Sequence, residues 1–313
     1  MDSKKIVRSF QRALARNALY FFGWFFRWVP YSIMRGITFV FLKIGFVFMI
    51  RQRRIAEESL HIAFGKEKSE KEIKQIIRRC FDHFGLGMVE MLFFMAHPKM
   101  LGKKVQYEGL EYLDQAVAKG RGVIIVTAHF GNFPLLMFSL AKKGYAVNAI
   151  IRPARDEKLE ADLLRRRTEE GLKTIYAVPR RECVTSCLKA LRNNELLFIL
   201  LDQNFGNGSG VFVDFFGEKA ATGTGPVVFS LRTQAVILPM FIIREKGDFH
   251  RVIIEPPLEL ISGKTEDETL LVNTAKITQI IERYIRKYPH EWGWMHKRWK
   301  TKPEGSSSTK SEM

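Results

Sequence analysis

The chain has 313 residues and a formal net charge of +17, from 50 lysines and arginines against 33 aspartates and glutamates. That length can bury a substantial core, so a small scaffold held by disulfides is excluded. The three cysteines form an odd count without metal-ligand spacing, which favours a reducing compartment over a disulfide framework or a zinc site. The positive charge favours polyanionic partners: an anionic membrane, a phosphorylated lipid, nucleic acid or an acidic carrier protein.

The N-terminal segment at residues 13–50 is rich in phenylalanine and tryptophan, and charged residues and a proline interrupt it. No window of about 20 residues is both apolar and free of charge, so the usual signature of a spanning helix is missing. The composition instead favours an interfacial membrane anchor, with Trp24, Trp28 and Tyr31 at headgroup depth. The sequence RQRR at 51–54 disfavours a signal peptide and favours a cytoplasmic position for that end. A buried helical hairpin is the alternative interpretation.

Helices and strands alternate after this segment. A capping box of Ser69 and Glu72 opens a long helix that Pro98 ends. Further helices are predicted at about 134–142, 156–170, 183–192, 226–233 and 266–287. Strands are predicted at 122–128, 145–151, 173–178, 195–202, 210–217, 235–243 and 250–257.

Two of the strand sequences, GVIIVTA and LLFILL, are uncharged and rich in β-branched or large apolar residues. Such runs are typical of central strands covered on both faces. We therefore expect an α/β fold with a mixed, mostly parallel central sheet flanked by helices, and with an N-terminal membrane-associating helical segment. The predicted parts are the membrane-associating segment at 1–54, one domain at 55–302 and a polar, disordered tail at 303–313.

A histidine, His129, directly follows the first buried strand and precedes a turn and a helix. The carboxyl ends of strands are where open α/β sheets bind ligands. An imidazole at this place could take a proton from a hydroxyl, and backbone N–H groups near Gly131 could stabilise an oxyanion. The alternative is a polar residue that only fills a strand-to-helix turn.

Asp202 and Gln203 follow a second buried strand, before a glycine-rich loop that lacks the lysine of a phosphate-binding P-loop. If the two strands are neighbours, Asp202 could orient the His129 imidazole, as a carboxylate does in a catalytic triad. Asp202 could equally cap a turn, or pair with Arg152 or Arg155.

Three separated motifs add a family resemblance. HFGNF after a strand, LLDQN with GVFVDFFGEKAATGTGP, and the C-terminal RKYPHEWGWMHKRWK together resemble the lipid A late acyltransferase family of lauroyl and myristoyl acyltransferases, within the glycerolipid acyltransferase-like group. The resemblance spans about residues 55–302, and it implies that this part of the chain is an acyltransferase domain. It implies transfer of a fatty acyl chain from an acyl carrier protein or coenzyme A thioester to a lipid hydroxyl, with no cofactor and no metal.

The resemblance also implies roles for single residues. His129 would be the general base, and the matching positions beside it are Gly131 and Asn132. Arg152 matches an arginine that could hold a phosphate. The predicted substrate-binding residues are Gly131, Asn132, Arg152 and Gln203.

One position departs from the family motif His-x4-Glu/Asp, because Pro134 replaces the acidic residue. Either another carboxylate orients the imidazole, with Asp202 favoured over Glu90, or the reaction runs on His129 alone. Loss of an orienting acid can cost orders of magnitude in rate. A non-catalytic lipid-binding homologue is therefore the alternative to an active enzyme.

The expected partners are a lipid A-type glycolipid or related membrane lipid, the thioester donor, and the membrane surface at the cytoplasmic face of a bacterial inner membrane. Phenylalanines around 212–216 are candidates for an acyl-chain groove. The tryptophan-rich C-terminal motif could stack on bases, but we expect it to pack against the sheet and to contact an anionic headgroup. Nucleic acid is not an expected partner.

Overall fold

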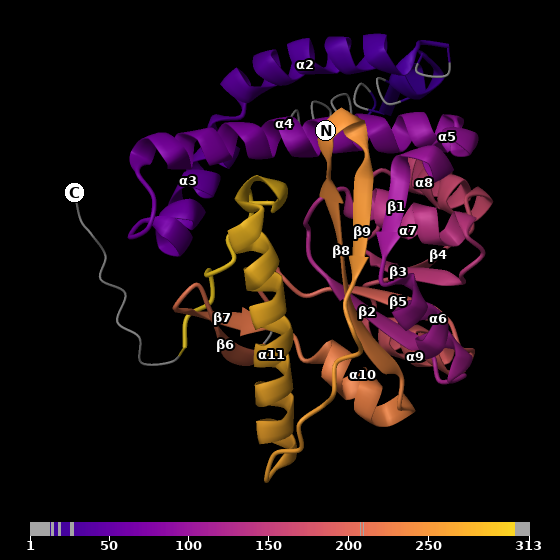
Figure 1. Cartoon of the computed structure of the whole chain (residues 1–313), viewed down its shortest axis with the longest axis vertical. Coiled ribbons are helices and arrows are strands. Elements are labelled where there is room, and N and C mark those ends of the chain that lie inside the picture. The colour runs from indigo at the N-terminus through magenta and orange to yellow at the C-terminus, as the bar shows by residue number, and fades with distance from the viewer. Residues whose placement is uncertain are drawn as a thin grey trace, which may run out of the picture.

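The computed structural model describes Ala13, Arg16, Asn17 and residues 20–25, 28–206, 208 and 210–303. Its centre is a seven-stranded sheet in the order β1-β9-β8-β2-β5-β3-β4 (Figure 1). The strands of this sheet are β1 Val105–Glu108, β2 Val123–Thr127, β3 Val147–Ile151, β4 Leu172–Tyr176, β5 Leu196–Leu200, β8 Val236–Arg244 and β9 His250–Ile254. The predicted tail lies outside the described residues, apart from Pro303.

Helices surround the sheet. They are α2 Tyr31–Phe48, α3 Ile50–Phe64, α4 Glu70–Ala96, α5 Pro98–Lys104, α6 Leu110–Ala118, α7 Phe133–Lys142, α8 Glu157–Glu169, α9 Arg180–Arg192, α10 Gly225–Thr233 and α11 Glu266–Lys287. The predicted capping box is present, since the Ser69 hydroxyl accepts from the Glu72 N–H while the Glu72 carboxylate accepts from the Ser69 N–H. Pro98 separates α4 from α5, as its position in the sequence predicts.

The strand directions confirm the predicted fold class. β8 and β9 run antiparallel, and every other pair of neighbours in the seven-stranded sheet is parallel. The structure adds β1 and α6, which the sequence pattern did not predict. The predicted strand at 210–217 is present as β6 Val211–Phe215, and it pairs with β7 Glu218–Thr222 in a separate hairpin outside the central sheet.

Both faces of the sheet are covered, which explains the uncharged run in β2. Val123 and Ile125 belong to one buried cluster together with residues of α6 and α7. Ile124 and Val126 belong to a second cluster with residues of α9, α10 and α11. Successive side chains of a strand point to opposite faces, so a strand buried on both sides has no polar positions.

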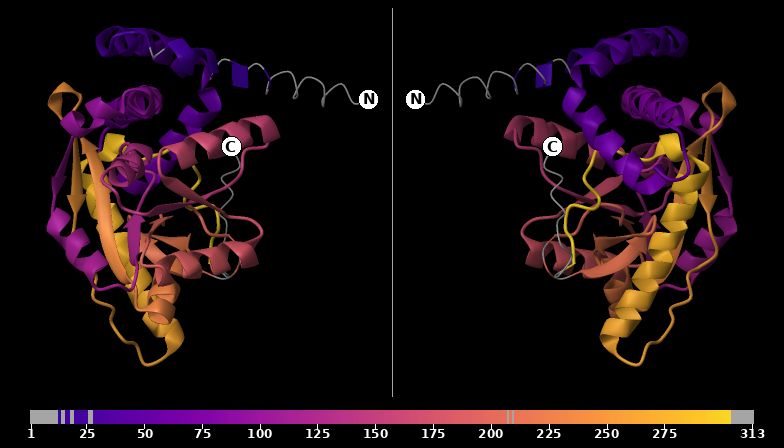
Figure 2. Two further views of the ribbon diagram at one scale, coloured as in Figure 1. Left: turned by 90° about the vertical axis from the view of Figure 1, so that its right-hand side faces the viewer. Right: turned by 90° about the vertical axis from the view of Figure 1, so that its left-hand side faces the viewer.

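An apolar helix, α2, lies along the outer side of α4, away from the sheet (Figures 1 and 2). The two helices approach closely at Gly85, where an added Cβ would lie 2.0 Å from the Leu42 Cδ2 atom. By length and composition α2 could cross a membrane, and it is the one helix of the described residues that could. Its outer side is exposed: Phe48 is 79% exposed, and Trp28, just before the helix, is 76% exposed. The alternative of a buried hairpin is therefore wrong.

Candidate active site

The neighbouring strands β2 and β5 bring His129 and Asp202 together. These strands are parallel and in register, with Thr127 opposite Leu200. His129 and Asp202 each follow that pair by two residues, so they leave the same edge of the sheet side by side. The His129 Nδ1 atom lies 2.9 Å from Asp202 Oδ1, and the His129 N–H donates to Asp202 Oδ2 at 3.0 Å. The contact that the sequence suggested is present, and the alternative pairing of Asp202 with Arg152 or Arg155 is wrong.

The C-terminal tryptophan-rich motif completes the surroundings of the carboxylate. The Trp292 Nε1–H donates to Asp202 Oδ2 at 2.8 Å, and the His296 Nε2 atom lies 3.2 Å from the Asp202 carbonyl oxygen. Trp292 and Trp294 are fully buried, which confirms the expected packing against the sheet. Sequence reasoning missed the Trp292–Asp202 contact, because 90 residues separate the two partners.

The ionisation of this pair follows from burial and mutual charge. Burial alone would raise the pKa of the Asp202 carboxyl, but the charge and hydrogen bond of His129 and the Trp292 N–H hold that pKa well below its usual range. Burial alone would lower the pKa of the His129 imidazole, but the Asp202 charge and hydrogen bond outweigh burial and raise it. Asp202 is thus a carboxylate near neutral pH, and it favours a proton on His129 Nδ1.

The edge of the imidazole that carries Nε2 borders a cavity. The His129 side chain is 31% exposed, and its Nε2 atom lies 3.2 Å from the amide nitrogen of Gln203. With Nδ1 protonated, Nε2 carries the lone pair and accepts from this amide. His129 and Gln203 both line a cavity of about 760 Å³.

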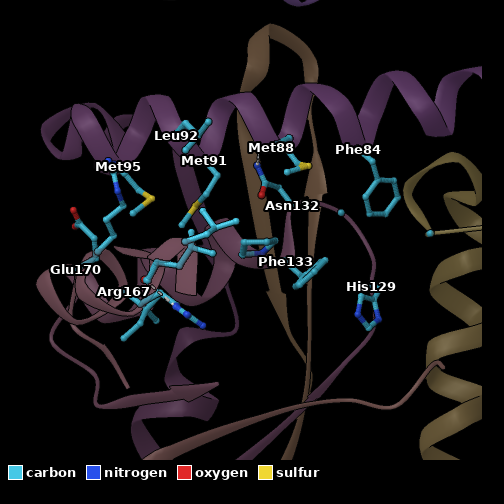
Figure 3. Close-up of a pocket in the computed structure, with 18 of the residues that line it drawn as sticks. Phe84, Met88, Met91, Leu92, Met95, His129, Asn132, Phe133, Arg167 and Glu170 are labelled. Atoms are coloured by element: carbon cyan, nitrogen blue, oxygen red, sulfur yellow. Dashed lines mark hydrogen bonds between the residues drawn. The ribbon is translucent and has the colours of Figure 1, made fainter. Parts of the chain in front are cut away.

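This cavity is mostly apolar and extends along the underside of α4, from Phe84 near His129 to Met95 near Arg167 and Glu170 (Figure 3). Its apolar lining comes from α4, α7 and α8 and includes Met88, Met91, Leu92, Met95, Phe133, Pro134, Leu159 and Leu163. The predicted groove around the phenylalanines of the β6–β7 hairpin is wrong, because Phe215 and Phe216 are buried in the core against Trp299.

The turn after His129 is fixed by close backbone packing. Gly131 has φ +58°, and a Cβ there would lie 1.9 Å from the Ile242 carbonyl oxygen, so only glycine fits. The Gly131 N–H donates to the Glu291 carbonyl oxygen at 2.8 Å. This N–H is therefore not free to stabilise an oxyanion, while stabilisation by other backbone N–H groups near Gly131 stays a prediction.

Asn132 caps the helix that follows the turn. Its Oδ1 atom accepts from the Leu135 N–H at 3.3 Å, and its Nδ2 group donates to the Gly87 carbonyl oxygen at 3.2 Å and faces Glu90 at 3.4 Å. The side chain is buried and spans α7 and α4. These contacts hold the His129 turn against α4, while a role of Asn132 in substrate binding stays a prediction.

Glu90, the second candidate for the orienting acid, is occupied elsewhere. Its two carboxylate oxygens accept from the Arg244 guanidinium at 2.6 Å each, and one of them also accepts from the Tyr31 hydroxyl at 2.6 Å. Glu90 is fully buried in this arrangement. Of the two carboxylates, the structure therefore places Asp202 against His129.

Arg152 lies outside the cavity. It follows β3, which β5 separates from β2, and its side chain is exposed. It shares the carboxyl edge of the sheet with His129 without lining the same cavity. Among the described residues, one group has atoms close enough to hold a metal ion, namely Glu57, His61 and Glu70, and none of the three lines the cavity.

Comparison with known proteins shows which family the chain belongs to. The family described as bacterial lipid A biosynthesis acyltransferase matches residues 2–301. The chain is 28% identical over 292 residues to lipid A biosynthesis lauroyltransferase of Escherichia coli (strain K12), covering 91% of each chain. It is 26% identical over 196 residues to phosphatidylinositol mannoside acyltransferase of Mycobacterium tuberculosis (strain CDC 1551 / Oshkosh), covering 61% of this chain and 58% of the relative.

A solved structure, the 1-acyl-sn-glycerophosphate acyltransferase of Thermotoga maritima, aligns with a TM-score of 0.36 and 13% identity, covering 80% of this chain and 96% of that chain. The family match covers nearly the whole length, and it confirms the resemblance that the motifs around His129, Asp202 and Trp292 indicate. The chain belongs to the bacterial lipid A biosynthesis acyltransferase family.

Proposed function

We propose that this protein transfers a fatty acyl chain from an acyl carrier protein or coenzyme A thioester to a hydroxyl of a lipid A-type glycolipid or a related membrane lipid. Family membership and the names of the relatives support an acyltransferase that acts on glycolipids. The observation that carries the proposal is the His129–Asp202 pair, whose Nε2 atom faces a large apolar cavity.

In the proposed reaction, His129 acts as the general base. Its Nε2 atom takes the proton of the acceptor hydroxyl while the hydroxyl oxygen attacks the carbonyl carbon of the thioester. The tetrahedral intermediate then collapses, the C–S bond breaks, and the leaving thiolate takes the proton from the imidazolium. The products are an ester and a free thiol, so atoms and charge balance without a covalent enzyme intermediate.

Asp202 and Gln203 assist in different ways. The Asp202 carboxylate keeps the Nδ1 proton in place and stabilises the imidazolium that forms during attack. The Gln203 amide lies beside Nε2, where the acceptor hydroxyl must come, so the hydroxyl displaces it and the amide becomes free to donate to a substrate oxygen.

The acyl chain would occupy the apolar cavity. Its methionines on α4 suit an alkyl chain because an unbranched thioether side chain adapts to irregular apolar shapes. The N-terminal segment borders the same cavity, since Tyr20 lines it and Arg16 forms an ion pair with Asp156, which caps α8. A lipid could thus enter the cavity from the side on which the N-terminal segment lies.

Membrane attachment is part of the proposal. The exposed apolar side of α2 would contact the cytoplasmic face of the inner membrane, and the cations at 51–54 directly after α2 would stay on the cytoplasmic side. Arg152, exposed at the same edge of the sheet, would hold an anionic group of the acceptor.

The test is acyl transfer from a panel of acyl carrier protein and coenzyme A thioesters to the total membrane lipid of the native host. Wild type and His129→Ala are compared, and products are identified by mass spectrometry. A new acylated lipid that wild type makes and His129→Ala does not is the expected result, and its mass names the acceptor. No product from any donor, with intact folding, would instead support the non-catalytic lipid-binding homologue.

A further inference from the structure

A second concave site lies away from the catalytic cavity, where the C-terminal end of α2, the start of α3 and the first half of α4 meet (Figure 1). It has a volume of about 510 Å³. Its lining consists of Phe46, Ile50, Arg53, Arg54, Glu57, Lys74, Ile77 and Arg78. We call Arg53, Arg54, Lys74 and Arg78 the cationic pocket. None of these four residues lines the catalytic cavity.

The cationic pocket has more cations than carboxylates in its lining, while Asp82, one helical turn after Arg78, acts on the Arg78 charge from outside the lining. Its four cations face a single lining carboxylate, Glu57. Among the residues that the structure describes, none of the four cations forms an ion pair within 4.0 Å. An adjoining hollow that shares Lys74 and Arg78 adds Lys71 and Arg79, against one carboxylate, Glu70. The region therefore carries an excess of positive charge that an external anion can satisfy.

An aromatic ring holds two of the guanidinium groups in place. The Arg53 and Arg78 guanidinium carbons lie 4.8 Å and 5.4 Å from the centroid of the Phe46 ring. The Arg53 Nε–H is buried, and among the described residues it has no hydrogen-bond partner. A buried N–H cannot reach a ligand oxygen, so a bound phosphate would accept from the terminal N–H groups of the Arg53 guanidinium, which the ring holds in place.

The place of the cationic pocket indicates the ligand. The last turns of α2 expose Ile44, Val47 and Phe48 directly beside it, and Ile50 forms part of its lining. When this apolar side lies in a membrane, the cations that follow it lie at the depth of the lipid phosphates. Arginine matches phosphate oxygens with two parallel N–H donors, and the apolar lining suits the first carbons of the lipid.

We propose that the cationic pocket binds the phosphodiester headgroup of an anionic phospholipid, separately from the substrates of the catalytic site. Bound there, the lipid fixes the orientation of the domain on the membrane. The proposal rests on the membrane association proposed above, but it does not depend on acyl transfer.

The experiment measures binding of the full chain to vesicles of phosphatidylcholine, with and without phosphatidylglycerol, at physiological ionic strength. The test variant is Arg53→Gln with Arg78→Gln. The matched control is Lys189→Gln with Arg192→Gln, on α9 at the far end of the molecule from α2 (Figure 1). It removes two exposed cations that form no ion pair with any residue that the structure describes. Thermal unfolding checks that both variants fold.

Wild type should bind the phosphatidylglycerol vesicles more tightly than phosphatidylcholine alone. The test variant should lose about 30-fold in affinity for the anionic vesicles, since each surface cation contributes on the order of 1 kcal/mol. Its affinity for pure phosphatidylcholine should stay unchanged, and the control should stay close to wild type on both.

Unchanged binding in the test variant would overturn the proposal. An equal loss in the control would overturn it too, because the attraction would then come from the net charge of the whole protein. Loss of vesicle binding on addition of inorganic phosphate alone would mean a site for free phosphate instead of a lipid headgroup. Acyl transfer assayed in detergent tests the proposed function independently, so the two failures can be told apart.

Discussion

Asp202 gives His129 a carboxylate partner although Pro134 stands where the family motif has an acid. The carboxylate comes from the end of β5, not from the first turn of α7. Pro134 lines the apolar cavity instead, and as an early helical residue it has no N–H that would need a partner. The His129 imidazole therefore has a carboxylate as a hydrogen-bond partner despite the departure from the motif.

Replacing this acid should lower the rate and shift its pH dependence. In the proposed reaction, attack needs a neutral His129 imidazole. The rate should then rise with pH through the pKa of His129, which Asp202 raises above the ordinary 6.5. In Asp202→Asn the charge that raises this pKa is gone while burial, which lowers it, remains. The acid limb of the kcat/KM profile should move to lower pH, and kcat should fall about 10³- to 10⁴-fold. Steady-state kinetics over a pH series measures both effects.

The matched control is Asp214→Asn on the exposed β6–β7 hairpin, which should leave the profile as in wild type. An Asp202→Asn enzyme with unchanged kcat and an unchanged acid limb would show that Asp202 only supports the structure. The alternative in which the reaction runs on His129 alone would then hold.

Gly131 allows a second test at the same scale. Gly131→Ala would place a methyl group 1.9 Å from the carbonyl oxygen of Ile242, and that oxygen belongs to the backbone of β8 and cannot turn away. We expect a loss of about 3 kcal/mol in the free energy of unfolding, from the contact and the left-handed backbone together. Gly120→Ala has a similar φ of +70° and no atom within 4 Å, so it should lose only about 1 kcal/mol. Equal losses in urea denaturation would refute the steric explanation.

At the scale of elements, a buried ionic contact joins α2, α4 and β8 close to the turn that follows His129. Glu90 of α4 binds Arg244 at the end of β8 and Tyr31 at the start of α2, and its carboxylate also faces Asn132. Burial alone would raise the pKa of Glu90, but Arg244 and His250 outweigh burial and keep the carboxyl ionised. The orientation of α4 over His129 thus depends on a charge pair with little access to water.

Glu90→Gln should therefore destabilise the fold. Among the described residues, the substitution leaves the buried Arg244 charge with Asp248 as its remaining carboxylate, at 3.9 Å. We expect a loss of about 3 kcal/mol in the free energy of unfolding. Glu58→Gln breaks an exposed pair with Lys297, at 3.8 Å, and should cost less than about 1 kcal/mol. Urea denaturation followed by circular dichroism compares them. A Glu90→Gln protein as stable as the Glu58→Gln control would show that the pair contributes no net stability.

Most elements were predictable from sequence, because periodicity, caps and prolines act locally. The helix opened by Ser69 and the strands that end before His129 and Asp202 have such local signals. No local signal shows that β2 and β5 lie side by side in the sheet. Parallel strands are joined by crossovers, and their order depends on the packing of the whole domain. For the same reason the sequence could favour Asp202 over Glu90 without fixing the contact, and it did not show that Trp292 binds the carboxylate.

At the scale of the whole molecule, many of the exposed apolar side chains lie at one end, and the cationic pocket lies there too. α2 lies at that end, with the cationic pocket at its C-terminal end, and α10 and the start of α11 lie at the opposite end (Figure 1). The outer side of α2 exposes Val40, Ile44 and Val47, spaced four and three residues apart, so they form one stripe on the helix. Apolar side chains in such a stripe mark a surface that another apolar phase covers.

The stripe should be necessary for membrane binding and dispensable for folding. Val40→Asn, Ile44→Asn and Val47→Asn together remove apolar area that is 51–60% exposed, so the thermal midpoint should change little. Binding to phosphatidylcholine vesicles should fall about 100-fold, at roughly 1 kcal/mol for each partly buried side chain. The control replaces Leu231, Ile261 and Leu271 by Asn, three exposed apolar residues of α10 and the α11 region, and should bind as wild type does. If the stripe variant binds the vesicles as tightly as wild type does, α2 is not the membrane contact. Another part of the chain or a partner protein must then cover the apolar surface.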